Sequence, residues 1–148
     1  MNISLKGKIA LVGGSTRGIG LAIANQLASS GASVCLMSRN QSKMEKIVDQ
    51  LSKDLNQEHS FIKVDFSDFD SLKVIMKDFF SKTKIDILIN NTQGPSSGNA
   101  LSKSVNDYQF AFDLLFKNIV YTSSLAIDHM EKQNWGRIIN VASVSVRE

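Results

Sequence analysis

A glycine-rich turn between an apolar run and an amphipathic stretch constrains the fold of this chain more than any other feature. Residues 8–12 read Lys-Ile-Ala-Leu-Val, as a buried strand does, and residues 19–30 carry apolar side chains at helical spacing. Residues 13–20, between them, contain four glycines. Glycine lets backbone turn sharply and approach a ligand, and the N-terminus of the next helix offers free N–H groups. This strand–turn–helix unit therefore predicts a dinucleotide-binding site.

The rest of the chain alternates short apolar runs with longer amphipathic stretches. The predicted strands are residues 8–12, 33–37, 60–64, 85–89 and 137–142, and the predicted helices are residues 19–30, 42–56, 68–81 and 105–132. Such alternation is typical of an α/β fold, in which helices cross over between parallel strands. Residues 90–100, which hold the single proline, form the longest predicted loop.

Composition excludes several classes of protein. The length of 148 residues predicts one domain, residues 1–148, and 43% hydrophobic residues are too many for a disordered chain. The single cysteine, Cys35, excludes a disulfide framework and fits the reducing cytoplasm. The apolar runs are too short for a membrane span and the N-terminus lacks a signal sequence, so we expect a cytoplasmic protein without a membrane partner. The net charge of +3 forms no basic cluster, which argues against a nucleic-acid partner.

Four motifs in chain order carry a resemblance to a known family. They are residues 14–20 (Gly-Ser-Thr-Arg-Gly-Ile-Gly), Asp65 after the third predicted strand, Asn90-Asn91 after the fourth, and residues 136–143 (Gly-Arg-Ile-Ile-Asn-Val-Ala-Ser). Together they resemble the short-chain dehydrogenase/reductase family, and most of all its 3-oxoacyl-acyl-carrier-protein reductases. The resemblance implies a Rossmann-type doubly wound parallel sheet, strand order 3-2-1-4-5, without the family's last strands. It also implies hydride transfer between a nicotinamide cofactor and a small-molecule carbonyl or alcohol.

The end of the second predicted strand indicates which nicotinamide cofactor binds. An NAD-specific site has a carboxylate there that accepts hydrogen bonds from ribose hydroxyls, and residues 36–40 contain no acid. Arg39 and Arg17 could instead hold a 2′-phosphate, with Ser38 donating a further hydrogen bond. We therefore predict NADP(H), against the alternative that both arginines are solvated surface residues. By resemblance Asp65 would contact the adenine edge and Asn90 the adenosine ribose. The predicted cofactor-binding residues are Gly14, Ser15, Thr16, Arg17, Gly18, Ile19, Gly20, Ser38, Arg39, Asp65, Phe66, Asn90 and Asn91.

The resemblance implies a catalytic serine, Ser143, which would orient the substrate carbonyl. The family's Tyr-x-x-x-Lys pair is not found, because Tyr108 is followed four positions on by Phe112 and Tyr121 by Leu125. In the family this pair lies further along the chain than Glu148 does here. We therefore expect a chain that stops before its active site is complete. The alternative is a catalytically incompetent nucleotide-binding fragment that needs a missing segment or a partner chain.

Three positions depart from the family pattern. The family's Asn-Asn-Ala-Gly reads Asn-Asn-Thr-Gln here, and we expect the side chain of Gln93 to crowd backbone that approaches the nicotinamide ribose. The family's first threonine is Gly13. The family's catalytic asparagine falls at Leu115, and the nearest asparagine, Asn118, lies about one helical turn away.

The remaining expectations concern metals and assembly. His59 and His129 lack partners at ligand spacing and are interpreted as structural, so no metal site is predicted. By resemblance, the long helix at residues 105–132 packs against its counterpart in a second subunit. We therefore expect a homo-oligomer, a dimer or a tetramer.

Overall fold

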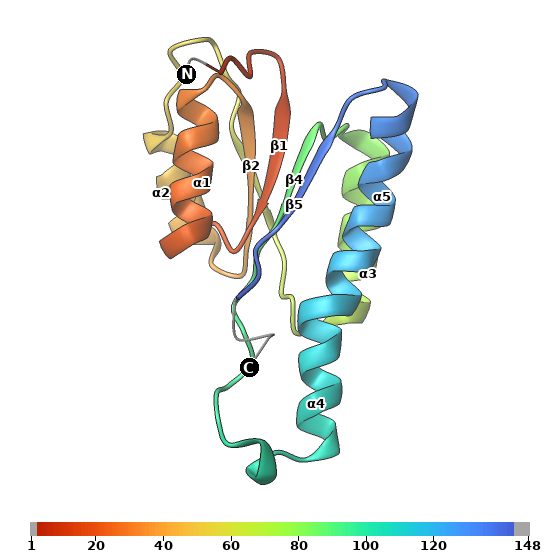
Figure 1. The fold of residues 1–148 in the computed structure, drawn as a ribbon. Helices are drawn as coiled ribbons and strands as arrows, with labels where there is room; N and C mark the ends of the chain where they lie inside the picture. Colours follow the sequence, from red (N-terminus) through yellow and green to blue (C-terminus); the bar gives the residue numbers. More distant parts are fainter. Residues whose placement is uncertain (1–2, 144–148) are drawn as a thin grey trace.

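The computed structural model describes residues 3–143 (Figure 1). The strands are β1 (Ile9–Gly13), β2 (Ser33–Ser38), β3 (Ser60–Lys63), β4 (Ile87–Asn90) and β5 (Arg137–Asn140). The helices are α1 (Gly18–Ser29), α2 (Gln41–Gln50), α3 (Phe69–Lys82), the 3₁₀ turn η1 (Ala100–Ser102), α4 (Val105–Phe112), the π-helical turn η2 (Asp113–Lys117) and α5 (Asn118–Lys132).

The strands form one five-stranded parallel sheet in the order β3-β2-β1-β4-β5. Figure 1 shows α1 and α2 on one face of the sheet and α3 and α5 on the other. This is the predicted Rossmann-type α/β fold, with the predicted strand order. Because all strands run the same way, the loops after β1, β2, β3 and β4 meet at one edge, where parallel α/β sheets bind ligands.

Each face of the sheet has its own apolar core, and β1 contributes to both. Ala10 and Val12 pack beneath α1 and α2, whereas Leu11, between them, packs beneath α3 and α5. All three side chains are fully buried. A strand covered on both faces is apolar at consecutive positions, which is why residues 8–12 lack an alternating pattern.

The predicted helix at residues 42–56 ends earlier than its sequence pattern indicates. Helix α2 stops at Gln50, because Leu51 adopts extended backbone while its side chain stays buried in the core. Asn56 then has a φ of 62°. The apolar spacing that continues to Leu55 thus belongs to a loop rather than to another helical turn, so the prediction of a helix over residues 51–56 was wrong.

The predicted helix at residues 105–132 is continuous but contains a π-helical turn, η2. At this turn the backbone N–H of Asn118 donates to the carbonyl of Asp113, five residues back. The carbonyl of Leu114, which an α-helix would have paired with that N–H, accepts the side-chain Nδ2 of Asn118 at 3.1 Å instead. Short π segments are found most often at functional sites.

The same long helix, Val105–Lys132, is the one described helix whose length and composition would let it cross a membrane. The uninterrupted apolar runs of the sequence are too short to predict this. In the structure Ala126 is fully buried and Met130 nearly so, both within the core formed with α3 and the sheet. Only 22% of the most apolar 18-residue window of the helix is buried, and one such helix is weak evidence for a membrane span.

A buried carboxylate, that of Asp86, bonds to several elements at the edge of the sheet opposite the loops after β1, β2, β3 and β4. Asp86 is 7% exposed and accepts hydrogen bonds from the backbone N–H of Ile9 (2.9 Å), Lys8 Nζ (3.3 Å) and Gln133 Nε2 (2.9 Å). Lys8 Nζ also lies 4.0 Å from the ring centre of Trp135. The group thus joins β1, the start of β4 and the turn between α5 and β5.

Candidate functional site

The glycine turn between β1 and α1 is shaped by close approach to the loop after β4. Gly14 has a φ of +56°, and a Cβ at that position would lie 2.7 Å from Nδ2 of Asn91. A Cβ on Gly20, in the first turn of α1, would overlap the carbonyl oxygen of Gly14. A Cβ on Gly13 would likewise overlap the carbonyl oxygen of Asn91. Position 13 therefore has no room for a threonine side chain in this structure.

Two side chains fix this turn to its neighbours. The buried Ser15 Oγ accepts a hydrogen bond from the N–H of Met37 at 3.0 Å, which ties the turn to β2. Asn91 Nδ2 donates to the carbonyl of Gly13 at 3.0 Å, which ties it to the loop after β4. The turn is therefore held from both sides before any ligand arrives.

The N-terminus of α1 is open toward solvent. Arg17 is the N-cap residue, its side chain makes no capping hydrogen bond, and the first turn carries no acid. The helix dipole and the first backbone N–H groups of α1 are thus available to a negatively charged group. A Cβ on Gly18 would meet nothing within 4 Å, so the space beside this turn is open.

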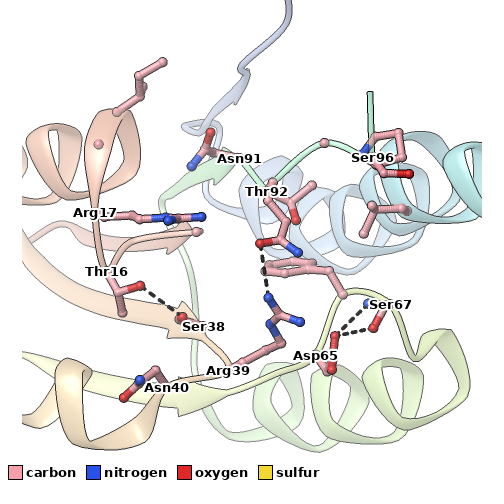
Figure 2. A pocket seen from close by; sticks show the side chains of 18 of the residues that line it. Thr16, Arg17, Ser38, Arg39, Asn40, Asp65, Ser67, Asn91, Thr92 and Ser96 are labelled. Atoms are coloured by element: carbon pink, nitrogen blue, oxygen red, sulfur yellow. Dashed lines mark hydrogen bonds between the residues drawn. The ribbon is translucent and has the colours of Figure 1, made fainter. Parts of the chain in front are cut away.

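The turn borders a pocket of about 740 Å³ at the carboxyl edge of the sheet (Figure 2). Arg17, Arg39 and Lys43 supply three cationic side chains to its lining. Among residues 3–143 none of the three belongs to a salt bridge. Ser38 lies beside them, with its hydroxyl 3.3 Å from that of Thr16. Anions suit such a pocket, because its fixed positive charge is not neutralised by direct ion pairs.

Among the described residues, Asp65 is the one acid in the lining of this pocket. Hydrogen bonds from the hydroxyl of Ser67 (2.6 Å) and from its backbone N–H (2.9 Å), with the nearby charge of Arg39, lower the pKa of the Asp65 carboxyl below its usual value. The carboxylate therefore stays ionised and acts only as an acceptor at neutral pH. Figure 2 shows it beside Ser67, facing Arg39.

Phe66, the next residue, is held by the π-helical turn. Nδ2 of Asn118 donates to the carbonyl of Phe66 at 2.7 Å, and Asn118 is 3% exposed. Its Oδ1 is buried and accepts no hydrogen bond from the described residues. The asparagine that reaches the site from the long helix is thus Asn118, whereas Leu115, the position aligned with the family asparagine, is 40% exposed.

The structure brings most of the predicted cofactor residues together. Those that line the pocket are Gly14, Thr16, Arg17, Gly18, Ile19, Ser38, Arg39, Asp65, Phe66 and Asn91. Ser15, Gly20 and Asn90 do not line it. Ser15 faces β2 as described, Gly20 packs on Gly14, and Asn90 points away, donating from Nδ2 to Ser123 Oγ (3.0 Å) and Asn140 Oδ1 (2.8 Å).

Ser143, the predicted catalytic serine, is exposed and does not line this pocket. Strand β5 ends at Asn140 rather than at Ala142, so Ser143 follows the strand by three positions.

Both ring nitrogens of His59 have hydrogen-bond partners within the fold. Nδ1 accepts a hydrogen bond from the N–H of Val34 at 3.1 Å, and Nε2 lies 2.8 Å from the carbonyl oxygen of Ser52.

The lining also holds residues outside the predicted cofactor set, Lys43 and Gln93 among them. Lys43 falls within the predicted helix at residues 42–56, and it lines the pocket because α2 begins at Gln41, two positions after Arg39. Gln93 was expected to crowd backbone, but its side-chain Oε1 accepts a hydrogen bond from Arg39 Nη2 at 3.1 Å. Lys43 could have been found from its place in the first turn of α2. No sequence pattern indicates the bond between positions 39 and 93.

Comparison with known proteins places this arrangement in a family. The family model described as short chain dehydrogenase matches residues 8–148. A 3-oxoacyl-[acyl-carrier-protein] reductase of Chlamydia pneumoniae is 38% identical over 146 residues, which cover 97% of this chain and 58% of that protein. An uncharacterized oxidoreductase of Staphylococcus aureus (strain USA300) is 34% identical, over 95% of this chain and 60% of its own length. The chain thus spans about three-fifths of the length of these relatives.

Solved structures agree with the fold. The L-sorbose reductase of Gluconobacter frateurii, complexed with NADPH and L-sorbose, superposes with a TM-score of 0.88 at 26% identity, over 99% of this chain and 57% of that one. A 3-oxoacyl (acyl-carrier-protein) reductase of Agrobacterium tumefaciens C58, with NADP bound, superposes with a TM-score of 0.85 at 26% identity, over 95% of this chain and 54% of that one. Sequence motifs, sheet order and the matched family model agree, and the chain belongs to the short chain dehydrogenase family.

Proposed function

We propose that this protein is an NADP(H)-dependent oxidoreductase that interconverts a carbonyl and an alcohol, and that residues 1–148 are its NADP-binding domain. The observation that carries the proposal is the cationic group of Arg17, Arg39 and Lys43 around the pocket, at a strand end without a carboxylate. A 2′-phosphate distinguishes NADP(H) from NAD(H), and guanidinium groups match its charge and geometry. The bound cofactors named for the two solved relatives support the same choice.

The residues present fit the cofactor. The glycine turn and the N-terminus of α1 would receive the pyrophosphate, because this N-terminus has no capping side-chain hydrogen bond and no acid in its first turn. Asp65, kept ionised by Ser67, would accept a hydrogen bond from the adenine amino group. Bound nicotinamide would supply the hydride, and Ser143 would donate a hydrogen bond that orients the substrate carbonyl. The proton that completes the alcohol would come from the tyrosine of the Tyr-x-x-x-Lys pair, in a further segment or a partner chain.

For the substrate we propose a 3-oxoacyl thioester. The relative with 38% identity and one of the solved structures carry that name. L-Sorbose, named for the other structure, is the natural competitor in a test. NADPH oxidation by the protein purified from its natural gene should be faster with acetoacetyl thioester than with L-sorbose at equal concentration. Oxidation with L-sorbose alone would contradict this substrate class.

The cofactor assignment is tested with Arg39→Ala. Charge-assisted hydrogen bonds are the strong ones, so the variant should bind NADPH on the order of ten- to a hundredfold more weakly and NADH almost unchanged. Lys46→Ala is the control, because Lys46 is an exposed cation of α2 that does not line the pocket. Nicotinamide fluorescence gives the dissociation constants of both variants for NADPH and NADH. Equal losses for NADPH and NADH in Arg39→Ala would contradict the assignment.

A further inference from the structure

Arg39 and Gln93 form a bridge across the pocket. Arg39 Nη2 donates to Gln93 Oε1 at 3.1 Å, although the two residues are 54 positions apart. Arg39 follows β2 and Gln93 lies in the loop after β4, and these strands flank β1 on opposite sides in the sheet. The hydrogen bond therefore joins loops that follow strands on the two sides of β1.

The bridge holds the guanidinium without neutralising it. Gln93 is uncharged and takes one of the five N–H donors of the guanidinium, so the others stay available to a ligand. The acid on the other side, Asp65, already accepts both the hydroxyl and the backbone N–H of Ser67. Both bonds go to Oδ1 of Asp65, and Arg39 forms no salt bridge with this carboxylate among the described residues. The remaining N–H groups of Arg39 are thus available to an anion.

Restricting the side chain of Arg39 before a ligand binds affects the free energy of binding. An exposed arginine loses much of its side-chain entropy when a ligand immobilises it, and that loss weakens binding. A partner that already restricts the guanidinium in the free protein reduces this loss. The gain applies only to ligand groups that contact the guanidinium.

We propose that Gln93 is a positioning residue that sets the preference for NADP(H) over NAD(H) by holding Arg39 in place over the pocket. This inference rests on the proposed function, since it requires that Arg39 binds the 2′-phosphate. Gln93 itself need not touch the phosphate.

A double-mutant cycle tests this directly, with the protein purified from its natural gene and NADPH and NADH as probes. Gln93→Ala should weaken NADPH binding about three- to tenfold, the loss expected when one side chain must be ordered anew, and leave NADH within about twofold. In the Arg39→Ala background, Gln93→Ala should have no further effect on NADPH. Gln93→Glu should weaken NADPH binding more than Gln93→Ala does, because the new carboxylate would pair with Arg39 and repel the 2′-phosphate.

The control is Gln109→Ala, since Gln109 is exposed on α4, bonds Asp113 through its side chain at 3.1 Å and does not line the pocket. It should change neither affinity, and melting curves verify that every variant folds. A loss shared equally by NADPH and NADH, the same loss with and without Arg39, or tighter NADPH binding by Gln93→Ala would each overturn the inference.

The outcome also separates this inference from the function beneath it. If the wild-type protein prefers NADPH and loses that preference with Arg39→Ala but not with Gln93→Ala, only the role of Gln93 is refuted. If the wild-type protein binds neither dinucleotide, the proposed function fails and the inference fails with it.

Discussion

At the scale of single residues, the close approach of backbone segments around Gly14 decides what the turn after β1 can accommodate. Gly14 combines a positive φ with a neighbour, Asn91, that any side chain would meet. Ser15 and Asn91 hold the turn in that shape through hydrogen bonds to β2 and to Gly13. The turn is therefore rigid for a loop, and its shape depends on glycine at position 14.

Gly14→Val should abolish binding of both dinucleotides and lower the thermal stability. A β-branched residue at positive φ is strained by about 1–3 kcal/mol, and its Cβ would displace the Asn91 side chain. Gly7→Ala is the control for binding, because Gly7 also has a positive φ (+77°), a Cβ there meets nothing within 4 Å, and Gly7 does not line the pocket. Calorimetric titration and melting curves measure the effects. Unchanged cofactor binding in Gly14→Val would show that the turn has no part in the site.

Cys35 should be chemically inert in the folded protein. Burial raises the pKa of its thiol from 9.0 to about 11, and a hydrogen bond with Ser60 offsets only part of that shift. Because the pKa is raised on folding, the neutral thiol favours the folded state fully below pH 9 and this contribution is lost as the pH rises towards 11. A thiol reagent at pH 8 should react only after denaturant is added. Rapid labelling of the native protein would refute this.

At the scale of elements, the strands and helices follow from local sequence, but the bonds between them do not. Buried strands such as β1 are recognisable because both faces are covered, and the order of the motifs along the chain, read through the family resemblance, implied the sheet order. The end of α2 was misplaced, because Leu51 and Leu55 continue a helical spacing in a loop. The bond from Asn118 to Phe66 and the bridge from Arg39 to Gln93 join positions that are distant in the sequence. A single sequence carries no signal for such pairs.

Asp86 joins three elements, and Asp86→Ala should destabilise the fold by about 2–4 kcal/mol. The substitution leaves the N–H of Ile9 without its acceptor and removes one of the two acceptors of the Gln133 amide, which also donates to the carbonyl of Trp135. Asp78→Ala is the control: its exposed pair with Lys82 should contribute less than about 1 kcal/mol. Urea denaturation measures the free energy of unfolding of both variants. Equal stabilities of the two variants would contradict the structural role of Asp86.

Asn118→Leu should weaken cofactor binding as well as stability, since it removes the donor that holds the carbonyl of Phe66 beside Asp65. The loss of two hydrogen bonds is expected to destabilise the protein by about 1–3 kcal/mol. Leu115→Asn, at the exposed position aligned with the family asparagine, is the matched exchange and should change stability little. An Asn118→Leu protein with wild-type NADPH affinity would refute the link to the site.

At the scale of the whole molecule, the outer face of the long helix suggests how copies assemble. Exposed apolar residues along it are Val105, Tyr108, Phe112, Leu115, Phe116, Val120 and Ile127. The rings of Phe112 and Phe116 lie 5.1 Å apart between centroids. Contiguous apolar surface of this kind marks interfaces. We therefore retain the proposal of a homo-oligomer formed through residues 105–132.

Phe116→Lys should shift the protein to smaller species in light scattering at micromolar concentration, because a charge would be buried in the interface. Val74→Lys, on the exposed face of α3, is the control and should leave the mass unchanged. A mass that Phe116→Lys does not alter would place the interface elsewhere.

The measurement that tests the central claim most directly is the ratio of the dissociation constants of NADH and NADPH for the wild-type protein. If the cations around the pocket hold a 2′-phosphate, NADPH binds more tightly by at least about tenfold, and the ratio falls as salt is added. Equal affinities, tighter binding of NADH, or no binding of either would contradict the account.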